Sequence, residues 1–139
     1  MSIKKRSMVC TVLLLAMFFA MCIPAMAATY NQVISLPANK AWTTAGSDAR
    51  SGAYSYVKVR NHSVYPSSGA DFFGLIRCKI TNESGTLLCN DNYYTLDEGA
   101  STYTQISIRE GYLNTEDVYF NFCGNTNSAA KAVVSYYAP

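Results

Sequence analysis

Two cysteines, Cys78 and Cys89, lie on either side of a polar turn in the stretch FGLIRCKITNESGTLLCN. In an exported protein, two facing thiols form a structural bond that stabilises the fold by restricting the unfolded chain. Their spacing is not the C-x-x-C that is typical of zinc or redox sites, and the single histidine, His62, lies in a different segment. The pair therefore predicts a structural disulfide, with no metal site.

Two hairpin registers are compatible with the turn NESG. If residues 82–85 form the turn, Ile80 lies opposite Leu87 and the two cysteines face each other. If residues 83–85 form a three-residue loop with Gly85 in the left-handed conformation, Ile80 lies opposite Leu88 and the cysteines do not face each other. The first register pairs apolar with apolar and thiol with thiol, so we expect that one.

Cys123, at the end of the run VYFNFC, leaves an odd number of cysteines in the segment that follows residue 27. An odd thiol is free or joins two chains. A small apolar role and a bond to Cys78 or Cys89 are alternatives. We expect Cys123 to be a free or intermolecular thiol, and the protein to be a monomer or a Cys123-linked dimer.

The chain offers few groups for catalysis. His62 is the one candidate base, and the segment NHSVYP around it has no nucleophile-elbow pattern. The carboxylates of Asp97-Glu98 and Glu116-Asp117 are adjacent in sequence beside turn residues, whereas a glycosidase holds two carboxyl groups across a cleft. The sequence predicts no catalytic residue and no cofactor, so the protein is expected not to be an enzyme. A small hydrolase that uses His62 is an alternative.

Two loops carry oxygen-rich side chains of the kind that bind Ca²⁺. They are Asp91-Asn92 and residues 114–117, NTED. Turn chemistry is the expected role of such residues, and a calcium site is kept as an alternative to the prediction of no metal.

Aromatic residues give the strongest indication of binding. In AYSYVKVR, strict alternation places Tyr54, Tyr56, Lys58 and Arg60 on one face of a strand. Aromatic rings beside cations are typical of recognition surfaces. With Trp42, these residues predict a binding surface for a glycan, a cell-envelope polymer or a protein. The alternative is that this face packs against a second sheet.

The elements that must position these groups read as short strands separated by turns, with no long helical period. Residues 61–71, NHSVYPSSGAD, are expected to form the longest loop. About eight or nine strands predict an all-β fold, a single antiparallel β-sandwich or small barrel over residues 28–139. The expected strands cover residues 30–36, 41–46, 53–60, 71–80, 86–90, 93–96, 101–109, 118–123 and 131–139.

The first 27 residues have the pattern of a secretory signal peptide. Three basic residues precede an apolar run that Pro24 and the small residues of Ala25-Met26-Ala27 close. We expect cleavage after Ala27, a secreted extracellular protein, and no membrane anchor after cleavage. Of the eleven basic residues eight then remain against nine acidic ones, a net charge of −1, which excludes a basic surface for nucleic acid.

The runs ISLPANKAWTT, YSYVKVRN and REGYLNTEDVYFNF, with a tyrosine-rich end, resemble small secreted proteins of Gram-positive bacteria of uncharacterised function. Some of these are neighbours of lactococcin-972-type bacteriocin export systems. Lactococcin 972 itself has a shorter mature chain, and no functional residue carries over from it. The resemblance implies a bacteriocin-like antagonistic role as the alternative to a binding protein.

Overall fold

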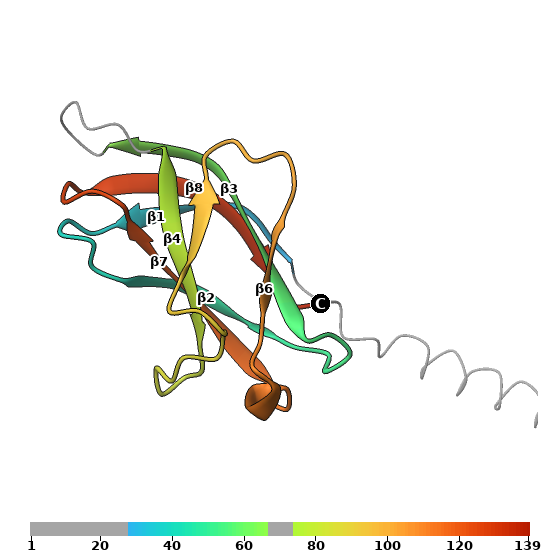
Figure 1. Ribbon diagram of the computed structural model, residues 1–139. Coiled ribbons are helices and arrows are strands. Elements are labelled where there is room, and N and C mark those ends of the chain that lie inside the picture. Colours follow the sequence, from blue (N-terminus) through green and yellow to red (C-terminus); the bar gives the residue numbers. More distant parts are fainter. Residues whose placement is uncertain (1–27, 67–73) are drawn as a thin grey trace, which may run out of the picture.

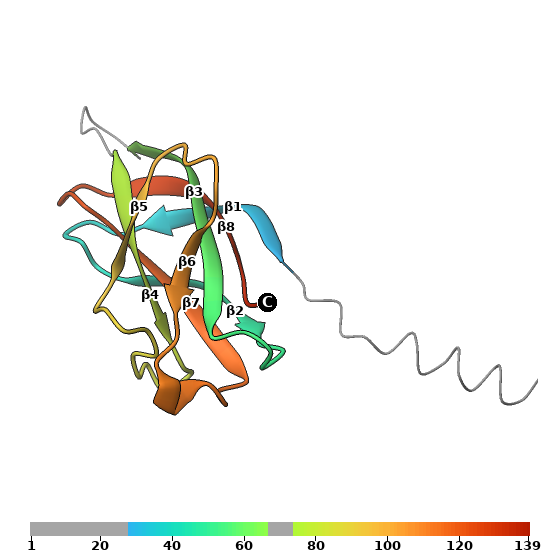
Figure 2. The same cartoon turned by 45° about the vertical axis from the view of Figure 1, so that its right-hand side comes forward.

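Residues 28–66 and 74–139 are described by a computed structural model, shown in Figures 1 and 2. This part of the chain forms eight strands and one 3-10 turn, with all strand pairs antiparallel. The predicted signal peptide, residues 1–27, lies outside it, as does part of the predicted loop, residues 67–71. The elements are β1 (Thr29–Leu36), β2 (Thr43–Ala49), β3 (Tyr56–Pro66), β4 (Leu75–Thr81), β5 (Tyr94–Asp97), β6 (Thr104–Ser107), η1 (Glu110–Tyr112), β7 (Asp117–Gly124) and β8 (Ala130–Tyr137).

The strands form two four-stranded sheets. The first sheet has the order β1-β8-β3-β6, and the second has the order β2-β7-β4-β5. The sheets pack face to face (Figure 1), so the predicted all-β sandwich is confirmed, and the strands do not close into a barrel.

The core lies between the two sheets because alternate residues of each strand face inward. Val57 and Val59 of β3 are fully buried, as are Phe120 and Phe122 of β7 in the opposite sheet. Tyr136 of β8 reaches into this layer, and its ring centroid lies 4.4 Å from that of Phe120. These aromatic side chains join the two sheets across the middle of the sandwich.

Tyr136 also explains a glycine in the facing strand. Its hydroxyl donates a 2.7 Å hydrogen bond to Gln32 Oε1, and it lies directly against Gly46 of β2. A Cβ at Gly46 would collide with the Tyr136 hydroxyl oxygen. Only a residue without a side chain therefore fits β2 at this point.

The prediction that Asn61 begins a loop was wrong. β3 continues to Pro66 and pairs with β8 along its length, with a register shift between Asn61 and Ser63. The inward side changes there, from Val57, Val59 and Asn61 to Val64. A bulge inserts one residue into the strand and reverses which positions face inward. A search for a two-residue alternation therefore does not detect the part of the strand that follows the bulge.

The expected hairpin register was also wrong, and the alternative with Gly85 left-handed is present. Thr81 pairs with Leu87, and the Leu88 N–H donates to the Ile80 carbonyl at 2.9 Å. Gly85 has φ +84°, which fits a three-residue loop that only glycine enters without strain.

This register separates the two cysteines that were expected to form a disulfide. Cys78 faces the core and pairs with Phe122 and Tyr94 of the two neighbouring strands. Cys89 does not pair with Cys78 and instead forms an isolated β-bridge, through the backbone, with Ile108. Cys78, Cys89 and Cys123 are all free and buried, so the predicted bond is not formed.

Candidate functional site

The predicted binding residues are divided between the two outer faces of the sandwich. Tyr56, Lys58 and Arg60 alternate with the buried Val57 and Val59, so they lie on the outer face of the first sheet. The alternative, that this side of the strand packs on the second sheet, is wrong. Trp42 lies on the outer face of the second sheet, where the Lys79 ammonium stands 4.5 Å from its ring centroid.

Tyrosines from three parts of the chain meet around Lys58. Tyr54 and Tyr56 have ring centroids 5.4 Å apart, and Tyr103 and Tyr137 meet edge to face at the same separation. Lys58 Nζ joins the two pairs, 5.8 Å from the Tyr56 centroid and 5.7 Å from that of Tyr137. We call these five residues the tyrosine face.

The tyrosine face presents aromatic area together with a cation. Tyr54 is 47% exposed and the other three rings are half-buried, so each has a packed side and an open one. The Lys58 ammonium is charged at neutral pH, as lysine ordinarily is, and a hydrogen bond with Tyr137 raises its pKa further. Rings at this spacing attract one another and the cation between them, which holds the cluster together before any ligand binds.

Arg60 is less available than its position on the strand suggested. Its Nε donates a 2.6 Å hydrogen bond to the Ala100 carbonyl and holds the turn that follows β5. The sequence did not connect Tyr103 and Tyr137 with this surface. Only the pairing of β3 with β6 and β8 brings these rings beside Lys58.

His62 lies in the bulge of β3 and contacts one buried hydroxyl. Its Nε2 is 2.7 Å from Ser135 Oγ, which also accepts a 2.9 Å hydrogen bond from the Asn31 N–H. Burial and the nearby Arg60 charge lower the pKa of His62, which favours the neutral imidazole in this contact. Ser135 is only 1% exposed, so a substrate carbonyl cannot reach its oxygen. The contact ties β1, β8 and β3 together.

The thiols have the properties of core residues. Burial raises the pKa of Cys78 well above its ordinary value, and neighbouring Cys89 and Cys123 add to the effect. Burial likewise raises the pKa values of Cys89 and Cys123. A thiol whose anion is disfavoured is a poor nucleophile.

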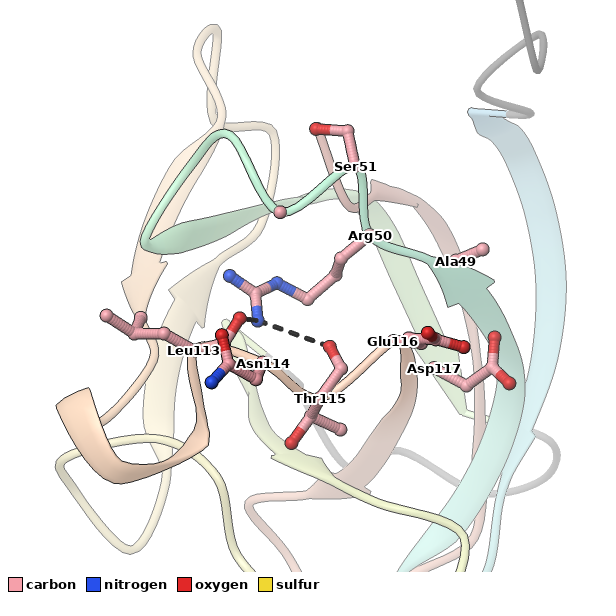
Figure 3. A pocket seen from close by; sticks show the side chains of 9 residues that line it. Ala49, Arg50, Ser51, Leu113, Asn114, Thr115, Glu116 and Asp117 are labelled. Carbon is pink, nitrogen blue, oxygen red and sulfur yellow. Dashed lines mark hydrogen bonds between the residues drawn. The ribbon is translucent and has the colours of Figure 1, made fainter.

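A polar pocket of about 400 Å³ opens at the end of the sandwich near η1, between residues 49–52 and 113–117. Arg50 points into the loop that follows η1 (Figure 3) and donates hydrogen bonds to the carbonyls of Leu113 at 2.9 Å and Thr115 at 3.4 Å. Another guanidinium nitrogen donates to the Tyr54 carbonyl. One backbone oxygen of the loop considered for calcium, that of Thr115, is therefore bound to the protein's own cation.

Metal ligands do not gather at either candidate loop. Among residues 28–66 and 74–139, no group of three or more His, Cys, Asp or Glu side chains is placed to hold a metal ion. The Arg50 pocket thus has a structural explanation.

Comparisons of the chain with family models, with curated proteins and with solved structures gave no match. The resemblance to small secreted Gram-positive proteins, and the antagonistic role that it implies, stay predictions. In the part of the chain that the structure describes, no helix is long and apolar enough to cross a membrane. Function is therefore inferred from the geometry.

Proposed function

We propose that this protein is a secreted, non-enzymatic binding protein that recognises a glycan or cell-envelope polymer through the tyrosine face. The observation that carries the proposal is the joined cluster of four tyrosine rings and Lys58 on the outer face of the first sheet. Secretion is supported by the pattern of residues 1–27.

The cluster has the composition that polymer binding requires. Tyrosine offers a large, rigid contact with a polar tip at a small cost in side-chain entropy, because it has two rotatable bonds. The open sides of Tyr54 and Tyr56 suit the apolar face of a sugar ring, and Lys58 suits its acidic substituents. An extended sheet surface can contact several repeats of a polymer at once.

The groups that could act as nucleophiles support binding rather than catalysis. Ser135 is buried beneath its contact with His62, and burial disfavours the thiolates of Cys78, Cys89 and Cys123. A small hydrolase would need one of these groups to be accessible and ionisable.

The test is retention of the purified protein, residues 28–139, on cell-wall peptidoglycan and on a glycan panel. Tyr56→Ala and Tyr137→Ala each remove one ring beside Lys58, and we expect each to weaken binding about tenfold, the effect of losing one buried aromatic contact. Tyr30→Ala is the matched control because Tyr30 is 68% exposed and lies outside the cluster.

Two results would contradict the proposal. One is a wild-type protein that none of these materials retains. The other is a protein in which the combined Tyr54→Ala, Tyr56→Ala and Tyr137→Ala variant folds normally and binds as tightly as the Tyr30→Ala control.

A further inference from the structure

The outer face of the second sheet carries a second group of rings and cations. In the register of β4 with β7, Arg77 lies beside Cys123 and Lys79 beside Asn121. Trp42 immediately precedes β2 on one side, and Tyr93 immediately precedes β5 on the other. We call Lys40, Trp42, Arg77, Lys79 and Tyr93 the basic face.

Each cation of β4 is held over a ring. Lys79 Nζ lies 4.5 Å from the Trp42 ring centroid, and the Arg77 guanidinium carbon lies 4.6 Å from that of Tyr93. Trp42 is 37% exposed and Tyr93 is 42% exposed, so both rings keep an open side. The two charged groups are thus fixed in the middle of the sheet with an aromatic ring on either flank.

Cys123 shows how closely the positive charges gather. It points to the outer face, yet it is only 1% exposed. Arg77 lies opposite Cys123 on β4, and Lys79 of the same strand reaches across β7 to the Trp42 ring. Arg77, Lys79 and Lys40 all act electrostatically on this thiol.

The cations stand out against the charge of the chain. Residues 28–139 carry a net charge of −1, but three of their eight basic residues surround one position. The outward carboxylates of the same sheet lie toward its ends. Asp97 is opposite Leu75, and Asp117 is opposite Ala49, six residues along β7 from Cys123, roughly 20 Å at strand rise.

Polar side chains on the same outer face as Arg77 and Lys79 are fixed by hydrogen bonds between the strands. The Thr44 hydroxyl donates to Asn121 Oδ1 at 2.7 Å, and Asn121 Nδ2 donates to Thr81 Oγ1 at 3.0 Å. Three neighbouring strands, β2, β7 and β4, are joined in this way. The surface is therefore organised before a ligand arrives.

We propose that the basic face is a second binding site, which takes a phosphate or carboxylate group carried on a sugar or polyol polymer. Arg77 and Lys79 contact the anion, while Trp42 and Tyr93 pack against the chain on either side of it. The proposal rests on the proposed function for the class of ligand, and it adds an anionic group and a site on the opposite face of the molecule.

The chain contains a specific reporter, because Trp42 is its only tryptophan. We would follow Trp42 fluorescence while adding poly(glycerol phosphate), polygalacturonate or uncharged dextran. We expect a saturable change with at least one of the two anionic polymers and none with dextran. The arm that responds identifies phosphate or carboxylate as the preferred group, and added salt should weaken binding.

The variants Arg77→Gln and Lys79→Gln remove the charges, and we expect each to weaken binding about tenfold or more. Lys131→Gln, at an exposed position of β8 in the first sheet and outside both faces, is the matched control and should leave the fluorescence titration unchanged. Lys40→Gln removes the third cation of the basic face, which lies outside the strands. Thermal unfolding of each variant establishes that it is folded.

The proposal is overturned if neither anionic polymer changes Trp42 fluorescence at low salt, if dextran binds equally well, or if Arg77→Gln and Lys79→Gln bind as the wild type does. These outcomes are separate from failure of the tyrosine face. If the basic face fails these tests, retention on peptidoglycan that depends on Tyr56 and Tyr137 would still support the tyrosine face. If that retention is absent, a Trp42 response would still support the basic face.

Discussion

Arg50 is a buried cation whose hydrogen bonds hold the loop after η1. Its guanidinium donates to the carbonyls of Leu113, Thr115 and Tyr54, and burial lowers the pKa of Arg50. Its Nε is buried with no hydrogen-bond partner. The three carbonyl oxygens offset the desolvation of this charge.

We expect Arg50→Met to reduce the free energy of unfolding by about 2–4 kcal/mol, because several backbone carbonyls lose a charged donor. Urea unfolding measures the change. Arg109→Met is the control, since Arg109 makes a single, longer bond of 3.5 Å to the Asn90 carbonyl. Equal effects of the two substitutions would contradict a structural role for Arg50.

Gly46 and Tyr136 form a pair whose coupling can be measured. A methyl group at Gly46 meets the Tyr136 hydroxyl, so Gly46→Ala should cost about 1–3 kcal/mol of stability. Gly111→Ala, where a Cβ meets nothing within 4 Å, should be close to neutral. Adding Tyr136→Phe to Gly46→Ala removes the obstructing oxygen, and a double-mutant cycle from urea unfolding should show partial recovery. An additive cycle would contradict the contact.

At the scale of elements, β3 shows where the prediction of strands from alternating residues succeeds and where it fails. The alternation of residues 53–60 correctly placed Tyr56 and Lys58 on one face of the strand, and in the structure Val57 and Val59 of the other face are buried. The same rule failed after Asn61, because the bulge reverses the inward side and a turn-like composition covers the rest of the strand.

The hairpin shows a different limit. Apolar pairing favoured Ile80 with Leu87, but the left-handed Gly85 fixes the loop length and hence the partner of Ile80. The fold class was predictable because strand patterns are local. The tyrosine face was predictable only in part, since Tyr103 and Tyr137 reach it through pairings between distant segments, which one sequence does not encode in any local pattern.

The bulge of β3 also predicts a pH dependence. Because burial and Arg60 lower the pKa of His62 below the unfolded value of about 6.5, the unfolded chain takes up a proton first as the pH falls. The stability contributed by neutral His62 is present above the unfolded pKa and is lost as the pH falls through the folded pKa.

His62→Gln should therefore flatten the change in urea midpoint between about pH 7 and pH 5. The comparison is with the wild type over the same range. A wild-type slope that persists unchanged in the variant would show that other groups carry it.

For the whole molecule, the two proposed binding faces on opposite sides of one sandwich predict cross-linking. The tyrosine face belongs to the first sheet and the basic face to the second. We expect wild-type protein to clump suspended cell-wall fragments, measured by turbidity. Variants with one altered face, Tyr56→Ala or Lys79→Gln, should still bind the fragments and clump them less. Clumping that is unchanged in both variants would contradict two independent faces.

The labelling rates of the free thiols report how different parts of the fold open. Cys123 is covered by side chains on an outer face, whereas Cys78 lies between the sheets. A maleimide should therefore modify Cys123 when Lys79 and Trp42 move aside, and Cys78 only when the sheets separate. The ratio of the two labelling rates, read by mass spectrometry, distinguishes local breathing from global unfolding in a single tube. An anionic polymer seated on the basic face should slow the first rate more than the second.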